Sequence, residues 1–213
     1  MKEESVSVKQ GKKALFYLIV QYQTDKIEAE RTIQMGNGNR GNTMIIKNGL
    51  VFTPEGKFEK KDFYIEGEYV AKETTDNKEV EAEGCYVIPG LVDIHFHGCV
   101  RHDMCDGTEE SIQALADYEA ANGVLAICPA TMTIPEEELF QAMNAAREHK
   151  NGKGADLVGI NMEGPFVNKE KKGAQKEEDI KLADVELFHK LQEAAGGLSL
   201  IHISEPTRPL YIS

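Results

Sequence analysis

PGLVDIHFHG, residues 89–98, places His95 and His97 at the end of a short apolar run and directly before a glycine. Side chains two positions apart in a β-strand lie on the same face of that strand. Two neutral imidazoles on one face can hold a divalent cation, and Gly98 lets the backbone turn away without crowding the ion. The alternative is two ordinary histidines at a strand end, so the rest of the sequence has to decide.

A second apolar run supplies that context. VGINMEGPF, residues 158–166, contains Glu163 at the end of the run, and Gly-Pro follows at once. A carboxylate that closes a buried strand needs a partner charge, because an isolated buried charge is costly. A cation would be such a partner, whereas a glutamate that faces water needs none. Together, the two runs favour a metal site formed by His95, His97 and Glu163.

Three stretches of sequence carry a family resemblance: residues 89–98, GVLAICPAT at 123–131, and MEGPF at 162–166, which is followed by KKGAQ at 171–175. They resemble the N-acetylglucosamine-6-phosphate deacetylases, a family of the metal-dependent amidohydrolase superfamily. The resemblance extends from Met44 to around Gly197. Glu-Gly-Pro-Phe with Lys-Lys-Gly separates this family from other amidohydrolases, whereas His-X-His marks only the superfamily.

The fold that this resemblance implies is α/β. We expect part of a small β-sandwich domain at residues 44–88, followed at residues 89–197 by a partial (β/α)8 amidohydrolase barrel with its first three βα units. A complete eight-stranded barrel typically needs ~250 residues, and the chain has 213. The sequence is therefore expected to be an N-terminal fragment of such an enzyme.

The two ends of the chain lie outside the resemblance. Residues 1–43 lack a family-like or strongly periodic pattern, so we expect a leader outside the fold, with Met44 as an alternative start. Residues 198–213 are expected to be a non-native tail. The string from Leu198 to Arg208 departs from the family and can be back-translated into a transposase-end adaptor used for sequencing libraries.

The residue pattern changes near Pro89. Before this residue, short strands alternate with turns predicted at Asn48-Gly49, Glu55-Gly56 and Glu66-Gly67. After it, strands alternate with helices, as a parallel barrel requires. The predicted strands span residues 91–97, 124–128 and 157–162, and the predicted helices begin after Thr108, at Pro135 and at Asp184.

The resemblance implies a role for each candidate site residue. Glu163 would be the primary metal ligand, and His95 with His97 would contribute to a second metal position that some members use. Ala174 and Gln175 would touch the sugar phosphate. Glutamine stands here where many relatives carry histidine, and its amide can still donate and accept hydrogen bonds.

The implied reaction is hydrolysis of N-acetylglucosamine 6-phosphate to glucosamine 6-phosphate and acetate. A divalent metal, zinc or iron, lowers the pKa of water from ~16 towards 7 and polarises the acetamide carbonyl. The leaving amine also needs a general acid. The family uses an aspartate late in the barrel, which we expect downstream of this chain. No catalytic residue is therefore assigned, and the isolated chain is expected to be inactive.

Composition narrows the range of partners. A formal net charge of −12 disfavours nucleic acid and anionic membranes, because both bind through clustered Lys and Arg. A small-molecule amino-sugar phosphate fits better. The four cysteines show no Cys-X-X-Cys spacing, which favours a reducing, cytoplasmic location. The full-length form is expected to be a homo-oligomer.

Two other interpretations stay open. A dihydroorotase or hydantoinase would share His-X-His, but would normally carry a metal-bridging lysine where Glu163 stands. A non-enzymatic, inert fragment is the second alternative, because the family's later histidines and aspartate are absent from the sequence.

Five further polar residues stand near these motifs or on the predicted helices. For Asp93, Asn161 and Lys172, a functional role and plain hydrogen bonding at strand ends are both open. His149 and His189 are expected on solvated helix faces.

Overall fold

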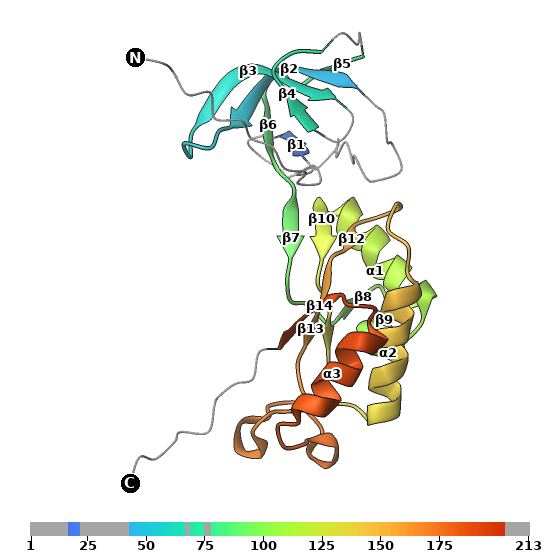
Figure 1. The fold of residues 1–213 in the computed structure, drawn as a ribbon. Coiled ribbons are helices and arrows are strands. Elements are labelled where there is room, and N and C mark those ends of the chain that lie inside the picture. The colour runs from blue at the N-terminus through green and yellow to red at the C-terminus, as the bar shows by residue number, and fades with distance from the viewer. Residues whose placement is uncertain (1–16, 22–42, 67–68, 75–77, 203–213) are drawn as a thin grey trace, which may run out of the picture. The chain divides into compact units, whose positions relative to one another are not determined.

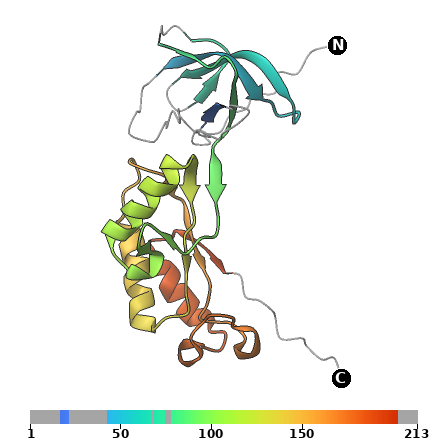
Figure 2. The ribbon, with the colours of Figure 1, turned by 180° about the vertical axis from the view of Figure 1, so that it is seen from behind.

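The structure is a computed structural model that describes residues 17–21, 43–66, 69–74 and 78–202. The chain divides between Pro89 and Gly90 into two compact units. Both units are drawn as ribbons in Figure 1 and, from behind, in Figure 2. None of the described helices is long and apolar enough to cross a membrane.

A six-stranded mixed sheet forms the described part of the first unit. Its order is β1-β6-β2-β3-β4, and β5 also pairs with β2. The strands are β1 (Tyr17–Gln21), β2 (Met44–Phe52), β3 (Phe58–Glu66), β4 (Tyr69–Ala71), β5 (Glu79–Glu81) and β6 (Cys85–Pro89). β2 runs antiparallel to β3 and parallel to β5 and β6. Buried residues alternate with less buried ones along β2 and, in β3, only at Phe63 and Ile65, because successive residues of a strand point to opposite faces.

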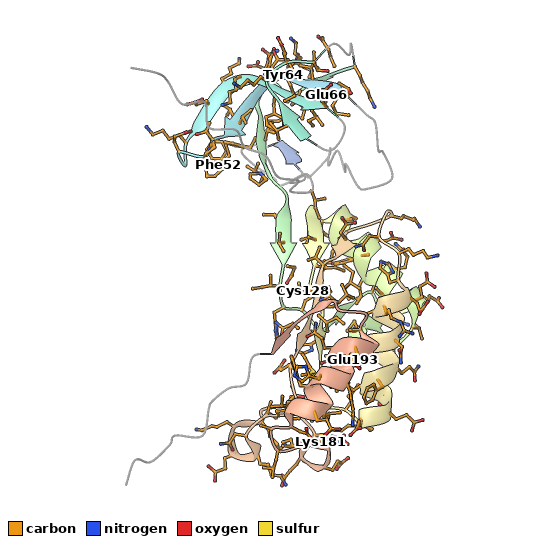
Figure 3. All side chains as sticks on the ribbon, viewed as in Figure 1. Phe52, Tyr64, Glu66, Cys128, Lys181 and Glu193 are labelled. Carbon is orange, nitrogen blue, oxygen red and sulfur yellow. The ribbon has the colours of Figure 1, made fainter. Side chains whose placement is uncertain are left out.

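The turn predicted at Glu55-Gly56 is confirmed between β2 and β3. Gly56 adopts a φ of 73°, and Thr53 N donates to Lys57 O at 2.8 Å, which closes the turn. Phe52, labelled in Figure 3, flanks the turn, with its ring centroid 5.2 Å from that of Phe58. The turn predicted at Glu66-Gly67 involves Gly67, which lies outside the described residues.

The turn predicted at Asn48-Gly49 is wrong, because both residues lie inside β2. The strand register shifts between Ile46 and Gly49, so the pair forms an irregularity in the ladder. Asn48 takes a φ of 61°, which asparagine tolerates better than most residues, and its N–H donates to Asp62 Oδ1. A Cβ on Gly49 would lie 2.7 Å from Val87 Cγ2. Glycine is therefore needed here for close packing of β2 and β6.

Strand β1 falls within residues 1–43, which were expected to lie outside the fold. It pairs antiparallel with β6, from Tyr17 opposite Pro89 to Gln21 opposite Cys85. An extended apolar segment can satisfy the hydrogen-bonding groups along an open strand edge. β1 is thus paired within the sheet although it precedes Met44, whereas residues 1–16 and 22–42 lie outside the described part of the chain, so the leader at residues 1–43 stays a prediction.

The second unit contains parallel strands joined by helices. Its strands are β7 (Leu91–Asp93), β8 (Gly98–Cys99), β9 (His102–Asp103), β10 (Val124–Ile127), β11 (Ala130–Thr131), β12 (Asp156–Leu157), β13 (Gly159–Met162) and β14 (Ser199–His202). Its helices are α1 (Glu109–Ala121), α2 (Glu136–Glu148) and α3 (Val185–Ala194), with short 3-10 turns at Met104–Asp106, Lys169–Lys171 and Glu177–Asp179. The sheets β12-β10-β7 and β11-β13-β14 are parallel, and β8 pairs antiparallel with β9.

All three predicted strands are longer than the strands observed, and the one predicted at 124–128 ends one residue early, at Ile127. The strand predicted at 91–97 ends at Asp93, whose Oδ1 accepts a hydrogen bond from His95 N at 2.9 Å and so competes with the strand ladder. The strand predicted at 157–162 is divided at Val158. β12 pairs with β10, whereas β13 pairs with β11, so the chain changes neighbours between the two segments.

The three predicted helices are present and pack along one side of these strands (Figures 1 and 2). Thr108 caps α1 by accepting from Ser111 N, and Asp184 caps α3 by accepting from Leu187 N. Pro135 occupies the N-cap of α2 rather than its expected first helical position. The buried stripes include Ile112, Leu115, Ala116, Leu139, Met143, Leu187 and Leu191.

Strand β14 lies in the segment that was expected to be a non-native tail. Its backbone pairs in parallel with β13, from Ser199 opposite Gly159 to His202 opposite Met162. Pairing at an open edge requires only extended backbone with free N–H and C=O groups. The pairing therefore assigns no function to this segment, and residues 203–213 lie outside the described range.

We predict that Gly49→Ala lowers the free energy of unfolding by about 1–3 kcal/mol, because its new methyl group overpacks the buried Val87 side chain. Urea unfolding followed by circular dichroism measures the change. In a Val87→Ala background the same substitution should cost less, since the colliding methyl group is gone. Strictly additive effects in the double variant would contradict this account of Gly49.

Candidate metal centre

Three candidate metal ligands converge in the second unit. Glu163 Oε2 lies 3.0 Å from His97 Nε2 and 3.5 Å from His95 Nε2. The two imidazole rings meet edge to face, with their centroids 5.2 Å apart. One ligand atom from each residue lies within 4.8 Å of the other two. Within the described ranges, no other group of three histidine, cysteine, aspartate or glutamate side chains meets this criterion.

Backbone hydrogen bonds between strands place these residues. The two histidines follow β7, and Glu163 follows β13. Cys128 N donates to Asp93 O at 2.8 Å, and Ala130 N donates to Phe96 O, so the histidine segment stays beside the next strands after β7 ends. The carboxyl ends of parallel strands commonly form the ligand site of α/β folds. The histidines thus reach the site from an irregular segment, and not from the continuous strand that was predicted.

The donor set fits a divalent transition metal. Two imidazole nitrogens with one carboxylate oxygen are ligands of both zinc and non-haem iron. The side chains of His95, His97 and Glu163 are 41%, 36% and 32% exposed, so the cluster is open to water and to a small substrate. His97 Nδ1 is buried and has no hydrogen-bond partner in the described part of the chain. The outer hydrogen bond that usually orients a metal-bound imidazole is therefore not seen at His97.

The two candidate substrate contacts differ in accessibility. Ala174 is exposed, whereas Gln175 is only 4% exposed. Gln175 Oε1 accepts a hydrogen bond from Thr133 N at 2.6 Å, and its Nε2 lies 3.7 Å from Met132 Sδ. The Gln175 side chain is therefore occupied by contacts within the protein. These contacts connect the loop after Glu163 to the segment that follows β11.

The three polar residues with open roles all make hydrogen bonds to backbone. Asp93 accepts from His95 N, and Lys172 Nζ donates to Gln175 O at 2.9 Å. Asn161 Nδ2 donates to Ile94 O at 2.9 Å. All three contacts are of the kind expected if these residues serve only in hydrogen bonding. The contacts of Asp93 and Asn161 involve the backbone beside the candidate ligand His95.

Thr133 is a site residue that the sequence analysis missed. It donates its backbone N–H to Gln175, and a Cβ on Gly164 would collide with its Oγ1. Gly164 also has a φ of 97°, a conformation that favours glycine. The glycine directly after Glu163 therefore lets Thr133 pack against that segment. One feature of the sequence pointed to Thr133: it is the second threonine, two positions after Thr131, at the end of an apolar run.

His149 does not lie on a solvated helix face, although the sequence led us to expect it there. It ends α2 as its C-cap residue, and both ring nitrogens are buried without a hydrogen-bond partner among the described residues. Burial lowers the pKa of the imidazole, and nearby Glu109 opposes this effect. The lysine and glutamate neighbours in the sequence did not reveal the packing around the helix end. His189, by contrast, is exposed on α3 as expected.

The cysteines near the site are thiols, and one of them supports the backbone. Cys105 Sγ accepts a hydrogen bond from Met132 N at 3.1 Å. Burial raises the pKa of the Cys105 thiol to about 12, although the bond from Met132 N favours the thiolate. Cys128, labelled among the strands in Figure 3, is also buried, and burial raises its pKa.

We predict that Cys105 resists alkylation in the folded chain at pH 8. With a thiol pKa of about 12, the thiolate fraction would be on the order of one in ten thousand, and the thiolate is the nucleophile. Peptide mass spectrometry after iodoacetamide treatment gives the extent of modification, with the same chain in urea as the control. Equal labelling rates of Cys105 in both conditions would refute the buried placement.

Comparisons with known proteins agree with this architecture. No family model matches the chain. The chain is 35% identical over 160 residues to N-acetylglucosamine-6-phosphate deacetylase from Bacillus subtilis (strain 168), covering 72% of this chain and 39% of the relative. It is 26% identical over 161 residues to the enzyme of the same name from Lysinibacillus sphaericus, covering 72% and 42%.

A solved structure matches the fold. It is an N-acetyl-D-glucosamine-6-phosphate deacetylase variant from Mycobacterium smegmatis, in complex with N-acetyl-D-glucosamine 6-phosphate. The TM-score is 0.65 at 20% identity, and the match covers 79% of this chain and 45% of the other. The chain therefore has the fold of part of a sugar-phosphate deacetylase. The two relatives compared above are N-acetylglucosamine-6-phosphate deacetylases, and the chain spans about two fifths of the length of each.

Proposed function

We propose that this chain provides metal ligands and part of the substrate site of an N-acetylglucosamine-6-phosphate deacetylase. The observation that carries the proposal is the convergence of His95, His97 and Glu163 from two segments that are far apart in the sequence. Homology to deacetylases supports the same reaction. The reaction is hydrolysis of the acetamide to give glucosamine 6-phosphate and acetate.

Each candidate ligand has a distinct part in this proposal. Glu163 is the primary ligand, because its carboxylate supplies negative charge as well as an oxygen donor. His95 and His97, which the resemblance assigns to a second metal position, are proposed to contribute nitrogen donors to the same cation as Glu163 through Nε2, because these atoms face its carboxylate. A divalent cation held there, zinc or iron, would supply Lewis-acid polarisation of the acetamide carbonyl and a lowered water pKa.

The loop after Glu163 is the proposed substrate-binding segment. Ala174 is exposed and able to touch the sugar phosphate. Gln175 is proposed as the second contact, although its side chain is hydrogen-bonded to Thr133. Its amide would have to release Thr133, or Gln175 would contribute through its backbone. The loop carries several lysines, which suit an anionic substrate: Lys169, Lys171, Lys172 and Lys176.

The proposal also covers the architecture and setting of the protein. Residues 44–88 would form part of a β-sandwich domain, and residues 89–197 would form the first three βα units of a (β/α)8 barrel. The parallel pairing of β7, β10 and β12 supports this arrangement.

A phosphorylated sugar carries charge and does not cross membranes unaided, so we place the reaction in the cytoplasm. The complete protein is proposed to be a homo-oligomer.

A different amidohydrolase, of the dihydroorotase or hydantoinase type, is the alternative enzyme. Such an enzyme would use a metal-bridging lysine, whereas this chain has Glu163 beside the two histidines. Turnover of a cyclic amide with no acetate release from the amino-sugar phosphate would favour the alternative.

We predict that the complete protein releases acetate from N-acetylglucosamine 6-phosphate and that exhaustive chelation abolishes this activity. Re-addition of zinc or ferrous iron should restore it, because the proposed ligands bind both ions. An enzymatic assay for acetate provides the measurement. Undiminished turnover in a metal-free preparation would rule out the proposed metal-dependent mechanism.

We also predict that Glu163→Gln loses more metal and more activity than His95→Asn. Removing the charged primary ligand should reduce metal affinity by more than ~100-fold, the upper range seen when only an outer hydrogen bond to a ligand is lost. Metal analysis after dialysis, with acetate release measured in parallel, compares the variants. Equal metal retention by both variants would contradict the ranking of the ligands.

A further inference from the structure

Asn161 makes a long-range hydrogen bond that the proposed function has not used. It lies on β13 and its side chain is only 1% exposed. Its Nδ2 donates to the backbone carbonyl of Ile94 at 2.9 Å, across 67 positions of sequence. Ile94 directly precedes His95, and Asn161 stands two residues before Glu163. One buried amide therefore joins the two segments that carry the candidate ligands.

The backbone of the histidine segment is held mainly through its carbonyl groups. The carbonyls of Asp93, Phe96 and His97 accept from the backbone N–H groups of Cys128, Ala130 and Met104 respectively. The Ile94 carbonyl accepts instead from the Asn161 side chain. The Ile94 side chain is 56% exposed, so packing of that side chain contributes little to holding the segment. The contact from Asn161 thus fixes the backbone directly before the first histidine.

The orientation of the Asn161 amide follows from the chemistry of its partner. A carbonyl oxygen can only accept a hydrogen bond, so Nδ2 must face Ile94 and Oδ1 must point away from it. Asn161 Oδ1 is buried and has no hydrogen-bond partner in the described part of the chain. Burying an amide oxygen in this way costs free energy, which an apolar residue of similar size would avoid. The amide at this position is therefore better explained by its donor than by packing.

We propose that Asn161 is a positioning residue, which sets the direction of His95 and His97 relative to Glu163 through the Ile94 carbonyl. The inference rests on the proposed metal site and adds to it a residue that touches neither metal nor substrate. Loss of the Nδ2 donor should let the segment before His95 move away from β13. The metal would then lose the preformed geometry of its ligands.

The test compares zinc and cobalt binding by the 213-residue chain with that of its Asn161→Asp and Asn161→Leu variants. Aspartate keeps the shape but turns an acceptor towards the Ile94 carbonyl, whereas leucine removes both the donor and the unpartnered oxygen. Competition with a chromophoric chelator measures zinc affinity, and the visible absorption of bound Co²⁺ reports ligand geometry. We expect both variants to lose about 10- to 100-fold in zinc affinity and to show an altered cobalt spectrum.

Asn151→Asp is the matched control. Asn151 Nδ2 also donates to a backbone carbonyl, that of Leu157 at 3.0 Å, and lies in the same unit but outside the candidate site. This variant should lower the melting temperature and leave zinc affinity and the cobalt spectrum unchanged. Asn161→Leu guards against misfolding, because it buries no additional polar group.

The outcomes separate the inference from the proposed site. Unchanged zinc affinity in Asn161→Leu, or a loss no larger than in Asn151→Asp, would overturn the positioning role while leaving the metal site intact. Absence of zinc binding by the unmodified chain would overturn both. A selective loss of affinity and a shifted cobalt spectrum in both Asn161 variants would support the role.

Discussion

The placement of the Glu163 carboxylate against two imidazoles is the constraint on which this account depends. Its Oε2 lies 3.0 Å from His97 Nε2 and 3.5 Å from His95 Nε2. A carboxylate facing two nitrogen lone pairs is repulsive unless a proton or a metal cation lies between them. Because all three side chains remain partly exposed, a cation and a small substrate can both reach them.

The fold supplies that placement through parallel strand pairing and a few side-chain contacts. The strands β7 and β13 belong to two different three-stranded sheets, and each ends shortly before its ligand segment without extending to the ligands themselves. Beyond the strand ends, individual hydrogen bonds from side chains hold the ligand segments in position. Asn161 holds the histidine segment, and Gln175 holds the loop that follows Glu163 against Thr133.

Part of this arrangement was accessible from the sequence. Apolar periodicity and capping residues located α1 and α3, because Thr108 and Asp184 act locally. Local patterns did not locate the irregularity at Gly49, which depends on Val87 of another strand. They also missed the partner of Asn161, which lies 67 positions away in the sequence. The early end of β7 was missed as well, although it follows from a local contact, in which the Asp93 side chain accepts from His95 N and competes with the strand ladder. The motif residues indicated which side chains converge, whereas tertiary hydrogen bonds determine how they are held.

Anomalous diffraction at the zinc absorption edge, from crystals of the protein equilibrated with zinc, tests the central claim most directly. We expect a zinc ion bonded at about 2.0–2.2 Å to Glu163 and to Nε2 of the neighbouring histidines. A zinc ion bound to other residues at saturating metal, with Glu163 in contact only with protonated imidazoles, would contradict the assignment of a metal centre.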